Sequence, residues 1–284
     1  MNDAHRTADA EAPAVVADFE RRARRFQTPC GDGFLIWRAW GSGPPVLLTH
    51  GAQGAWSHWI RNIDALARNR TVWAPDLPGY GESTMPPRAA QAAIAEVLAT
   101  GLLELLAPEL PLDIVGFSFG GVVAAHLAAL HPELVRRVIL VGCGGLDTPV
   151  GEIDLRRVRG LEGEERRAAH RANLLGLMLH HPASVDELAL HLQVTNGSRA
   201  RLNAAPLVMP DKLLEALPQV SARLDAIWGA HDRPHPPVDQ EKVLHSIHPD
   251  LDFRVIAGAG HWVMYEKPVE FNHTVLELLA RPLG

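Results

Sequence analysis

The chain has 284 residues, of which 47% are hydrophobic and 21% are charged, and it carries a formal net charge of −6. This composition is typical of a globular protein, and the acidic balance argues against binding to nucleic acid or to an anionic membrane. Two cysteines are too few for a disulfide framework. The first residues lack an apolar run of signal-peptide length and no window approaches a membrane span, so we expect a cytoplasmic protein.

Residues 1–30 are rich in alanine and charged residues and are predicted to form an N-terminal tail or a loose helix. From Phe34 onward, short apolar runs alternate with helical patterns, which favours an α/β fold with a mainly parallel central sheet flanked by helices. Helical spacing of apolar residues recurs in 59–67, 94–106 and 263–279. Strands are expected at Phe34–Trp40, Val46–Thr49, Val72–Ala74, Leu112–Val115, Val138–Val141, Leu224–Trp228 and Phe253–Ile256.

The alternation stops between residues 147 and 214, a charged segment with a helical pattern and no Phe, Trp or Tyr. A long helical segment between two strands of a parallel sheet indicates a cap, inserted here after the sixth core strand. The alternative is a helical layer with no gating role. The predicted organisation is therefore a tail at 1–30, a core formed by 31–146 and 215–284, and a helical cap at 147–214.

The stretch GFSFGG, residues 116–121, places one serine between glycines, directly after an apolar strand and before a helix of small residues. Glycine permits close backbone approach and sharp turns. A strained strand–turn–helix with serine at its tip is the nucleophile elbow, G-x-S-x-G. Ser118 is therefore the candidate nucleophile.

A serine nucleophile needs a base, a group that orients the base, and donors for the oxyanion. In the elbow fold these partners follow the serine in the order acid, then histidine. Asp232 follows one predicted strand and His261 follows the next, so both should lie at the carboxyl edge of the sheet with Ser118. Asp147, after the strand at 138–141, is a second candidate for the acid.

The oxyanion hole is predicted to use the backbone N–H of Phe119 and a second N–H from the loop after the Val46–Thr49 strand. Ala52 is the expected second donor, with Gln53 as the alternative. His50 lies in the same loop, but it precedes Ser118 in the chain. It is therefore interpreted as bracing the loop rather than as the base.

With these motifs the chain resembles enzymes of the α/β-hydrolase fold over nearly its whole length from Phe34. The serine at the elbow argues against the dehalogenase and epoxide-hydrolase branches, since that resemblance would imply aspartate there. The resemblance implies a Ser-Asp-His triad and no metal or other cofactor. The motifs that carry it are His50-Gly51, Asp76–Ser83, the Ser118 elbow, Gly229–Asp232 and Gly260-His261.

Within that superfamily the chain is most similar to meta-cleavage product hydrolases, on the strength of the C-terminal motif from His261-Trp262 to Asn272. It departs from them in having Phe117 where they usually have asparagine, as cofactor-free haloperoxidases and related esterases do. The resemblance also implies a cap arginine for a substrate carboxylate, and the comparable stretch offers Leu192 or Gln193 instead. Arg199 and Arg201 lie nearby but outside that register.

An aliphatic cap over an aromatic floor favours an uncharged or weakly polar small-molecule substrate. The leading hypothesis is a serine hydrolase that cleaves a small hydrophobic carboxylic ester or lactone through an acyl-enzyme. The alternatives are a meta-cleavage C–C bond hydrolase and a receptor-like scaffold that only binds a ligand, with acyl transfer, perhydrolysis and homo-oligomer formation left open. The expected substrate contacts are Gln53, Trp56, Phe117, Met178, Leu192 and Trp262.

Overall fold

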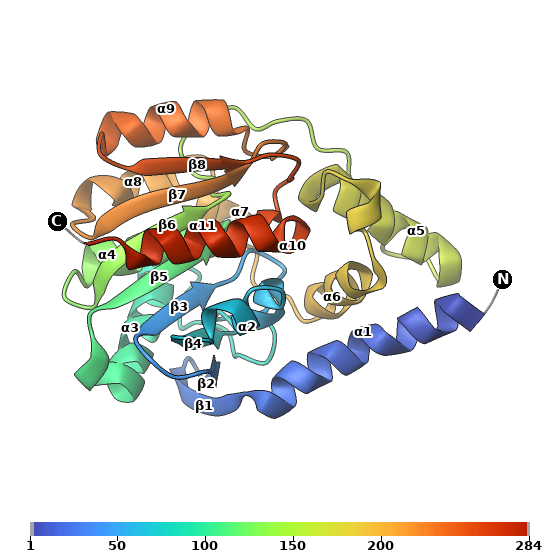
Figure 1. Ribbon diagram of the computed structural model, residues 1–284, viewed down its shortest axis with the longest axis horizontal. Helices are drawn as coiled ribbons and strands as arrows, with labels where there is room; N and C mark the ends of the chain where they lie inside the picture. The colour runs from blue at the N-terminus through green and yellow to red at the C-terminus, as the bar shows by residue number, and fades with distance from the viewer. Residues whose placement is uncertain (1–2, 283–284) are drawn as a thin grey trace.

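The computed structural model describes residues 3–282, with side chains described from residue 11 onward. Its centre is an eight-stranded sheet in the order β1-β2-β4-β3-β5-β6-β7-β8 (Figure 1). β2 is antiparallel to both of its neighbours, and β3 to β8 are parallel, which confirms the predicted α/β fold. The strands are β1 (Arg24–Cys30), β2 (Gly33–Trp40), β3 (Pro45–Thr49), β4 (Thr71–Pro75), β5 (Leu112–Phe117), β6 (Val135–Val141), β7 (Arg223–Gly229) and β8 (Asp252–Ile256).

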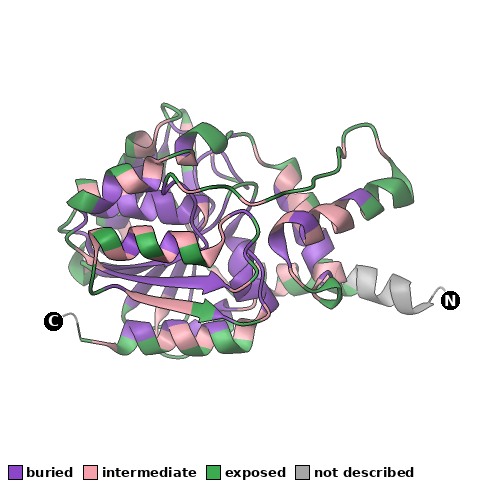
Figure 2. Ribbon diagram, turned by 90° about the horizontal axis from the view of Figure 1, so that it is seen from above, coloured by how far each residue is buried: buried purple, intermediate pink, exposed green. Residues whose placement is uncertain are grey.

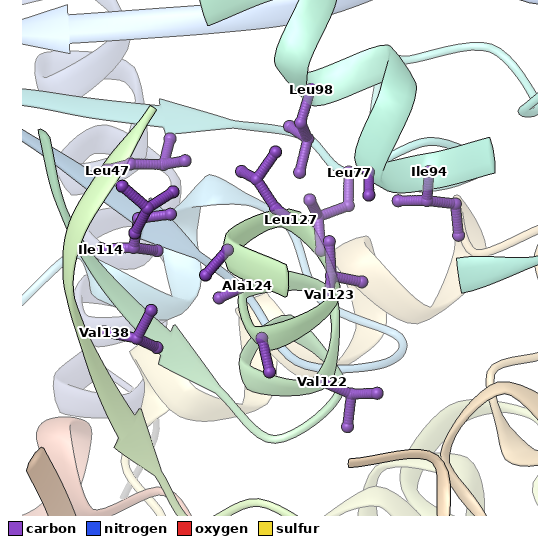
Figure 3. Packing of buried hydrophobic residues seen from close by; sticks show 14 of the residues in the cluster. Leu47, Leu77, Ile94, Leu98, Ile114, Val122, Val123, Ala124, Leu127 and Val138 are labelled. Atoms are coloured by element: carbon purple, nitrogen blue, oxygen red, sulfur yellow. The ribbon is translucent and has the colours of Figure 1, made fainter. Parts of the chain in front are cut away.

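Helices cover both faces of this sheet (Figure 2). β3 and β5 are buried along their whole length, so they are continuous apolar runs rather than alternating ones. Figure 3 shows Leu47 and Ile114 of these strands facing Leu127 of α4. One core is closed by α3 (Gln91–Leu106), α4 (Phe119–Leu130), α8 (Lys212–Ala216) and α9 (Pro237–Ile247), and the other by α2 (Ile63–Leu66), α10 (Val263–Glu266) and α11 (Pro268–Ala280).

The N-terminal segment is more regular than the tail predicted for residues 1–30. α1 (Asp3–Arg22) is followed by β1, which pairs along its length with β2. β1 is an edge strand in which only Thr28 and Cys30 are buried, and it contains Pro29. A proline and a weak alternation of apolar residues hide an edge strand from sequence patterns.

The helical insertion predicted after the sixth strand follows β6. α5 and α6 lie beside α1, toward the carboxyl ends of the strands (Figure 1), and α6 packs against α1. Residues 147–162 have no regular secondary structure, and the domain boundaries stay a prediction. The inserted elements are α5 (Gly163–Asn173), a π-helical turn η3 (Leu174–Met178), a 3-10 turn η4 (Pro182–Ser184), α6 (Glu187–Ser198), α7 (Ala205–Val208), α8 and a 3-10 turn η5 (Leu217–Gln219).

One helical stretch reaches the length of a membrane span, which was not expected from the sequence. Gln91–Glu109, formed by α3 and the 3-10 turn η2 (Ala107–Glu109), has 19 residues and a mean hydropathy of 1.3. Half of its apolar window is buried inside the protein. Ile94, Leu98 and Leu102 are fully covered in the core that α3 shares with α4 and β5. Core helices commonly have this composition.

Candidate active site

The turn between β5 and α4 holds Ser118 in a strained conformation. Its φ of 52° and ψ of −120° lie outside the regions that ordinary residues favour, as in a nucleophile elbow. The turn requires very close backbone approach, because a Cβ on Gly116 would lie 2.6 Å from the Cα of Gly121. The Ser118 N–H donates to the carbonyl of Val141 at 2.8 Å, which ties the turn to β6.

The histidine and the acid predicted from chain order are brought together at the carboxyl edge of the sheet. Nδ1 of His261 lies 2.9 Å from Oδ2 of Asp232, and both side chains are buried. Oδ1 of Asp232 accepts the backbone N–H of His235 at 3.0 Å. Since both carboxylate oxygens are engaged, the orientation of Asp232 is fixed.

Ser118 and His261 line one cavity of about 670 Å³. Among the described residues, Oγ of Ser118 makes no hydrogen bond with the imidazole of His261, a state that is common before substrate closes such a site. Asp147, the other candidate acid, is exposed, and its N–H donates to the carbonyl of Pro210. The structure therefore pairs His261 with Asp232 and not with Asp147.

The loop after β3 forms the wall of the cavity beside Ser118. Ala52, Gln53 and Phe119 all line the cavity, as the oxyanion prediction requires. His50 braces this loop, because its Nδ1 donates to the carbonyl of Gly51 and its Nε2 accepts the N–H of Leu77, both at 2.8 Å. These two contacts fix one neutral tautomer, and burial lowers the pKa of His50.

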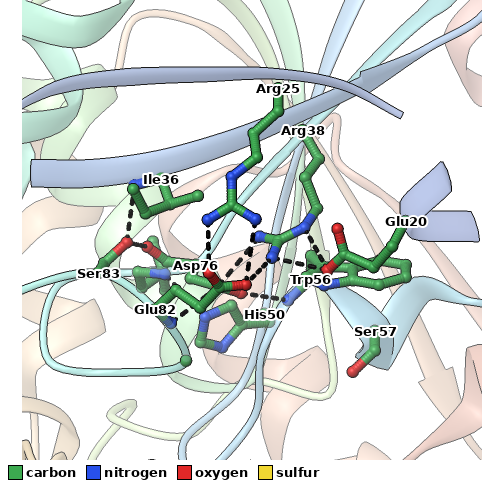
Figure 4. Close-up of polar contacts among 12 residues, drawn as sticks. Glu20, Arg25, Ile36, Arg38, His50, Trp56, Ser57, Asp76, Glu82 and Ser83 are labelled. Carbon is green, nitrogen blue, oxygen red and sulfur yellow. Dashed lines mark hydrogen bonds and ion pairs between the residues drawn. The ribbon is translucent and has the colours of Figure 1, made fainter. Parts of the chain in front are cut away.

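An ion-pair network centred on the buried side chains of Arg38 and Asp76 supports the same loop, with the partly exposed Glu20 and Glu82 at its edge (Figure 4). Arg38 lies 3.1 Å from Asp76, 2.7 Å from Glu20 and 2.5 Å from Glu82. Oδ1 of Asp76 accepts the backbone N–H of Trp56 at 3.0 Å, where the 3-10 turn η1 (Trp56–Trp59) begins. Because Arg38 is paired on three sides, the network links α1 and β2 to the loop that carries the predicted oxyanion donor.

Three of the six expected substrate contacts line the cavity and three do not. Gln53, Phe117 and Met178 face it. Trp56 instead packs against Phe19 and Trp40 and donates its indole N–H to Glu20, so it belongs to the network in Figure 4. Leu192, which lies on α6, and Trp262 are both buried in the hydrophobic core that α6 shares with the sheet. The indole N–H of Trp262 donates to the carbonyl of His58.

Several cavity residues had not been predicted. His58, Tyr80, Arg201 and His235 line the cavity together with apolar residues that include Val150, Ile153, Leu177 and Val208. His235 lies three residues after Asp232, and this closeness to a predicted site residue was the only indication in the sequence that it lines the cavity. Nothing in the sequence around His58 or Tyr80 distinguishes a cavity residue from a core residue.

A buried carboxylate joins the cap to the loop that carries His261. Glu266 accepts the backbone N–H groups of Gly260 at 2.7 Å, His180 at 2.9 Å and His181 at 2.7 Å. The N–H of Trp262 donates to the carbonyl of Met178 at 2.7 Å. Charge-assisted bonds of this kind are strong, so segment 178–181 and the loop that carries His261 form one unit.

The stability of the fold should depend on the titration of His235. Burial and the nearby His261 lower the pKa of His235 to about 4, whereas the unfolded chain takes up this proton near the ordinary value. The unfolded state then binds more protons between these values, so stability falls as the pH drops from about 6.5 to 4. We expect His235→Asn to reduce the loss of unfolding free energy between pH 7 and pH 5 by about 2 kcal/mol, measured by urea unfolding.

The control for this measurement is His273→Asn, because His273 is exposed. It should show the pH dependence of the wild type. If the unfolding free energy of His235→Asn fell with pH as steeply as that of the wild type, the predicted contribution of His235 would be contradicted.

Within residues 3–282, no group of three or more His, Cys, Asp or Glu side chains is arranged to hold a metal ion. The tight histidine groups do not converge as ligands. His180 and His231 stack face to face, with ring centroids 3.6 Å apart and planes inclined by 6°.

Comparison with known proteins places this architecture in a family. A family model described as alpha/beta hydrolase fold matches residues 44–167. A 2-hydroxymuconate semialdehyde hydrolase from Pseudomonas sp. (strain CF600) is 32% identical over 268 residues, which cover 88% of this chain and 88% of that protein. The chain belongs to the α/β-hydrolase fold family and is a hydrolase of that fold.

Solved structures agree on the fold. An esterase from Rhodococcus sp. ECU1013 superimposes with a TM-score of 0.75 at 24% identity, covering 93% of this chain and 100% of that one. A meta-cleavage product hydrolase superimposes with a TM-score of 0.70 at 22% identity, covering 89% of this chain and 97% of that one. At 24% and 22% identity, these structural similarities show a shared fold and do not show a shared activity.

Proposed function

We propose that the protein is a serine hydrolase that cleaves a small hydrophobic carboxylic ester or lactone. Oγ of Ser118 attacks the carbonyl carbon while Nε2 of His261 takes its proton, and Asp232 orients the imidazole. The backbone N–H groups of Ala52 and Phe119 stabilise the oxyanion. The proton then passes from His261 to the leaving alcohol, and water activated by the same imidazole hydrolyses the acyl-enzyme.

The observation that carries this proposal is the charge of the cavity. Arg201 is the only Lys, Arg, Asp or Glu among the described residues that line it. Arg201 is exposed and donates to the backbone carbonyls of Ser83 and Gly81, so it lies toward the rim. The other polar side chains of the lining are neutral groups such as Gln53, Gln193 and Asn203. A substrate carboxylate bound deep in the cavity would therefore lack a paired cation, at a cost of several kcal/mol.

A second candidate is hydrolysis of a carbon–carbon bond in a meta-cleavage product. Two observations favour it: Arg201 reaches the cavity, and the relative described above acts on 2-hydroxymuconate semialdehyde, according to its name. The same nucleophile and base would serve this reaction. The substrate carboxylate would then have to lie at the rim beside Arg201.

The test is steady-state turnover of two substrate sets, p-nitrophenyl esters of short to medium acids and a 2-hydroxy-6-oxo-dienoate. We expect the wild type to cleave the esters, and we expect Arg201→Gln to keep kcat/KM for them within about twofold of wild type. The reason is that an uncharged acyl group does not need the guanidinium. Cleavage of the dienoate alone, weakened at least tenfold in KM by Arg201→Gln, would replace the ester proposal with the second candidate. Binding without turnover of either set would indicate a ligand-binding scaffold.

A further inference from the structure

His58 is a buried polar side chain that neither the triad nor the oxyanion hole uses. It lies in η1 and is 5% exposed, yet it lines the cavity that contains Ser118. Its Nδ1 is fully buried and has no hydrogen-bond partner within the part of the chain that the structure describes. Among the described residues Nε2 has no protein partner either, and it is not a fully buried atom, so Nε2 is the ring nitrogen that faces the cavity.

The ring of His58 is held in place by its neighbours. The rings of Trp262, Phe117 and His50 lie with their centroids 5.0, 5.7 and 6.1 Å from it. Gly54 lies against the ring edge that carries both nitrogens, because a Cβ at this glycine would lie 2.2 Å from Cε1, 2.4 Å from Nδ1 and 2.7 Å from Nε2. The imidazole is thus held against the loop that carries the predicted oxyanion donor, and only a small part of the ring is accessible from the cavity.

A polar ring in such a place is not explained by packing. An apolar ring would fill the same space without burying a nitrogen that has no partner, which carries a desolvation cost. Burial, with His50 and His261 nearby, lowers the pKa of His58 well below its ordinary value, so the imidazole is neutral. A neutral imidazole has one donor and one acceptor, and no protein contact fixes its tautomer. It can therefore donate to a ligand or accept from one.

We propose that His58 is a specificity-determining residue that binds an uncharged oxygen of the substrate, a hydroxyl, keto or ether group close to the scissile carbonyl. This inference rests on the proposed ester hydrolysis and narrows its substrate class to esters or lactones of short oxygenated acids. His58 packs against Gly54 of the loop that carries the predicted oxyanion donor Ala52, and it lines the same cavity as Ala52 and Phe119.

Two pairs of esters with matched shapes test the proposal. p-Nitrophenyl 3-hydroxybutyrate differs from the isovalerate by a hydroxyl in place of a methyl group, and the methoxyacetate differs from the butyrate by oxygen in place of methylene. For each pair, kcat/KM of the oxygenated ester is divided by kcat/KM of the matched hydrocarbon ester. This ratio is compared between wild type and variants, so that the intrinsic reactivity of the two esters cancels. We expect His58→Phe to lower the ratio about tenfold in at least one pair.

His58→Gln keeps a donor and an acceptor and should hold the ratio within about threefold of wild type. His191→Phe is the matched control, because this histidine lies on α6 outside the cavity of Ser118. Ratios that stay within twofold of wild type for His58→Phe in both pairs would overturn the proposal and leave His58 as a packing residue.

A binding measurement separates failure of this inference from failure of the proposed function. Calorimetry with the 4-nitroanilides of 3-hydroxybutyric and isovaleric acid, on the Ser118→Ala background, requires no turnover. If wild type cleaves no ester but His58→Phe still removes a preference for the hydroxy ligand, ester hydrolysis fails and the role of His58 stands. If esters are cleaved but neither measurement depends on His58, only the role of His58 fails.

Discussion

Ser118→Ala should lower kcat on the order of 10⁵- to 10⁶-fold while KM stays close to that of the wild type. The reason is chemical, since alanine cannot form the acyl-enzyme and only binding and the oxyanion donors remain. Alanine removes one oxygen and leaves the strained turn without a new clash, so the unfolding free energy should change little. Steady-state and burst kinetics with p-nitrophenyl esters measure kcat and KM. Urea unfolding measures the free energy of unfolding.

Labelling provides the control for this prediction. A fluorophosphonate should add once to the wild type, at Ser118, and not at all to the variant. Ser198→Ala is the matched change, because Ser198 is an exposed serine whose Oγ donates to the carbonyl of Thr195. It should keep full activity. Retention of more than 1% of kcat by Ser118→Ala would show that another group is the nucleophile.

Asp232→Asn should lower kcat about 10⁴-fold with an unchanged fold. The asparagine oxygen can still accept the N–H of His235, which leaves its NH₂ group facing Nδ1 of His261. Nδ1 must then accept, so the proton lies on Nε2, and the imidazole can no longer take the proton of Ser118. The measurement is the pH profile of kcat/KM for both proteins.

Asp147→Asn is the control for the acid. Asp147 is exposed and its N–H is bonded to Pro210, so this change should leave kcat within about twofold. The reverse result, with Asp147→Asn inactive and Asp232→Asn active, would reassign the acid and contradict the geometry. Equal mild effects would mean that His261 needs neither carboxylate.

The residues fixed by backbone requirements could be predicted from the sequence. The elbow around Ser118 needs glycines at set offsets, and strands that run parallel deliver Asp232 and His261 to one edge. These constraints are local, so a pattern carries them. The edge strand β1 could not be predicted in this way, because its stability comes from pairing with β2 and Pro29 argues against a strand.

The direction of individual side chains could not be predicted. Trp56 and Trp262 were expected to contact the substrate, but both side chains are buried in the core, where large aromatic groups bury the most surface. His58, in contrast, was not expected at the site, but it lines the cavity from a turn whose residues are buried. Orientation depends on which neighbours arrive from distant parts of the chain.

The three backbone hydrogen bonds that Glu266 accepts bear on which part of the cap can move when a substrate binds. Segment 178–181 is hydrogen-bonded through Glu266 to the loop of His261, so displacing this segment would also displace the imidazole of His261. Residues 147–162 have no regular secondary structure, and Val150 and Ile153 of this segment line the cavity. Substitutions at these two positions would therefore change the shape of the cavity without removing any hydrogen bond that Glu266 accepts.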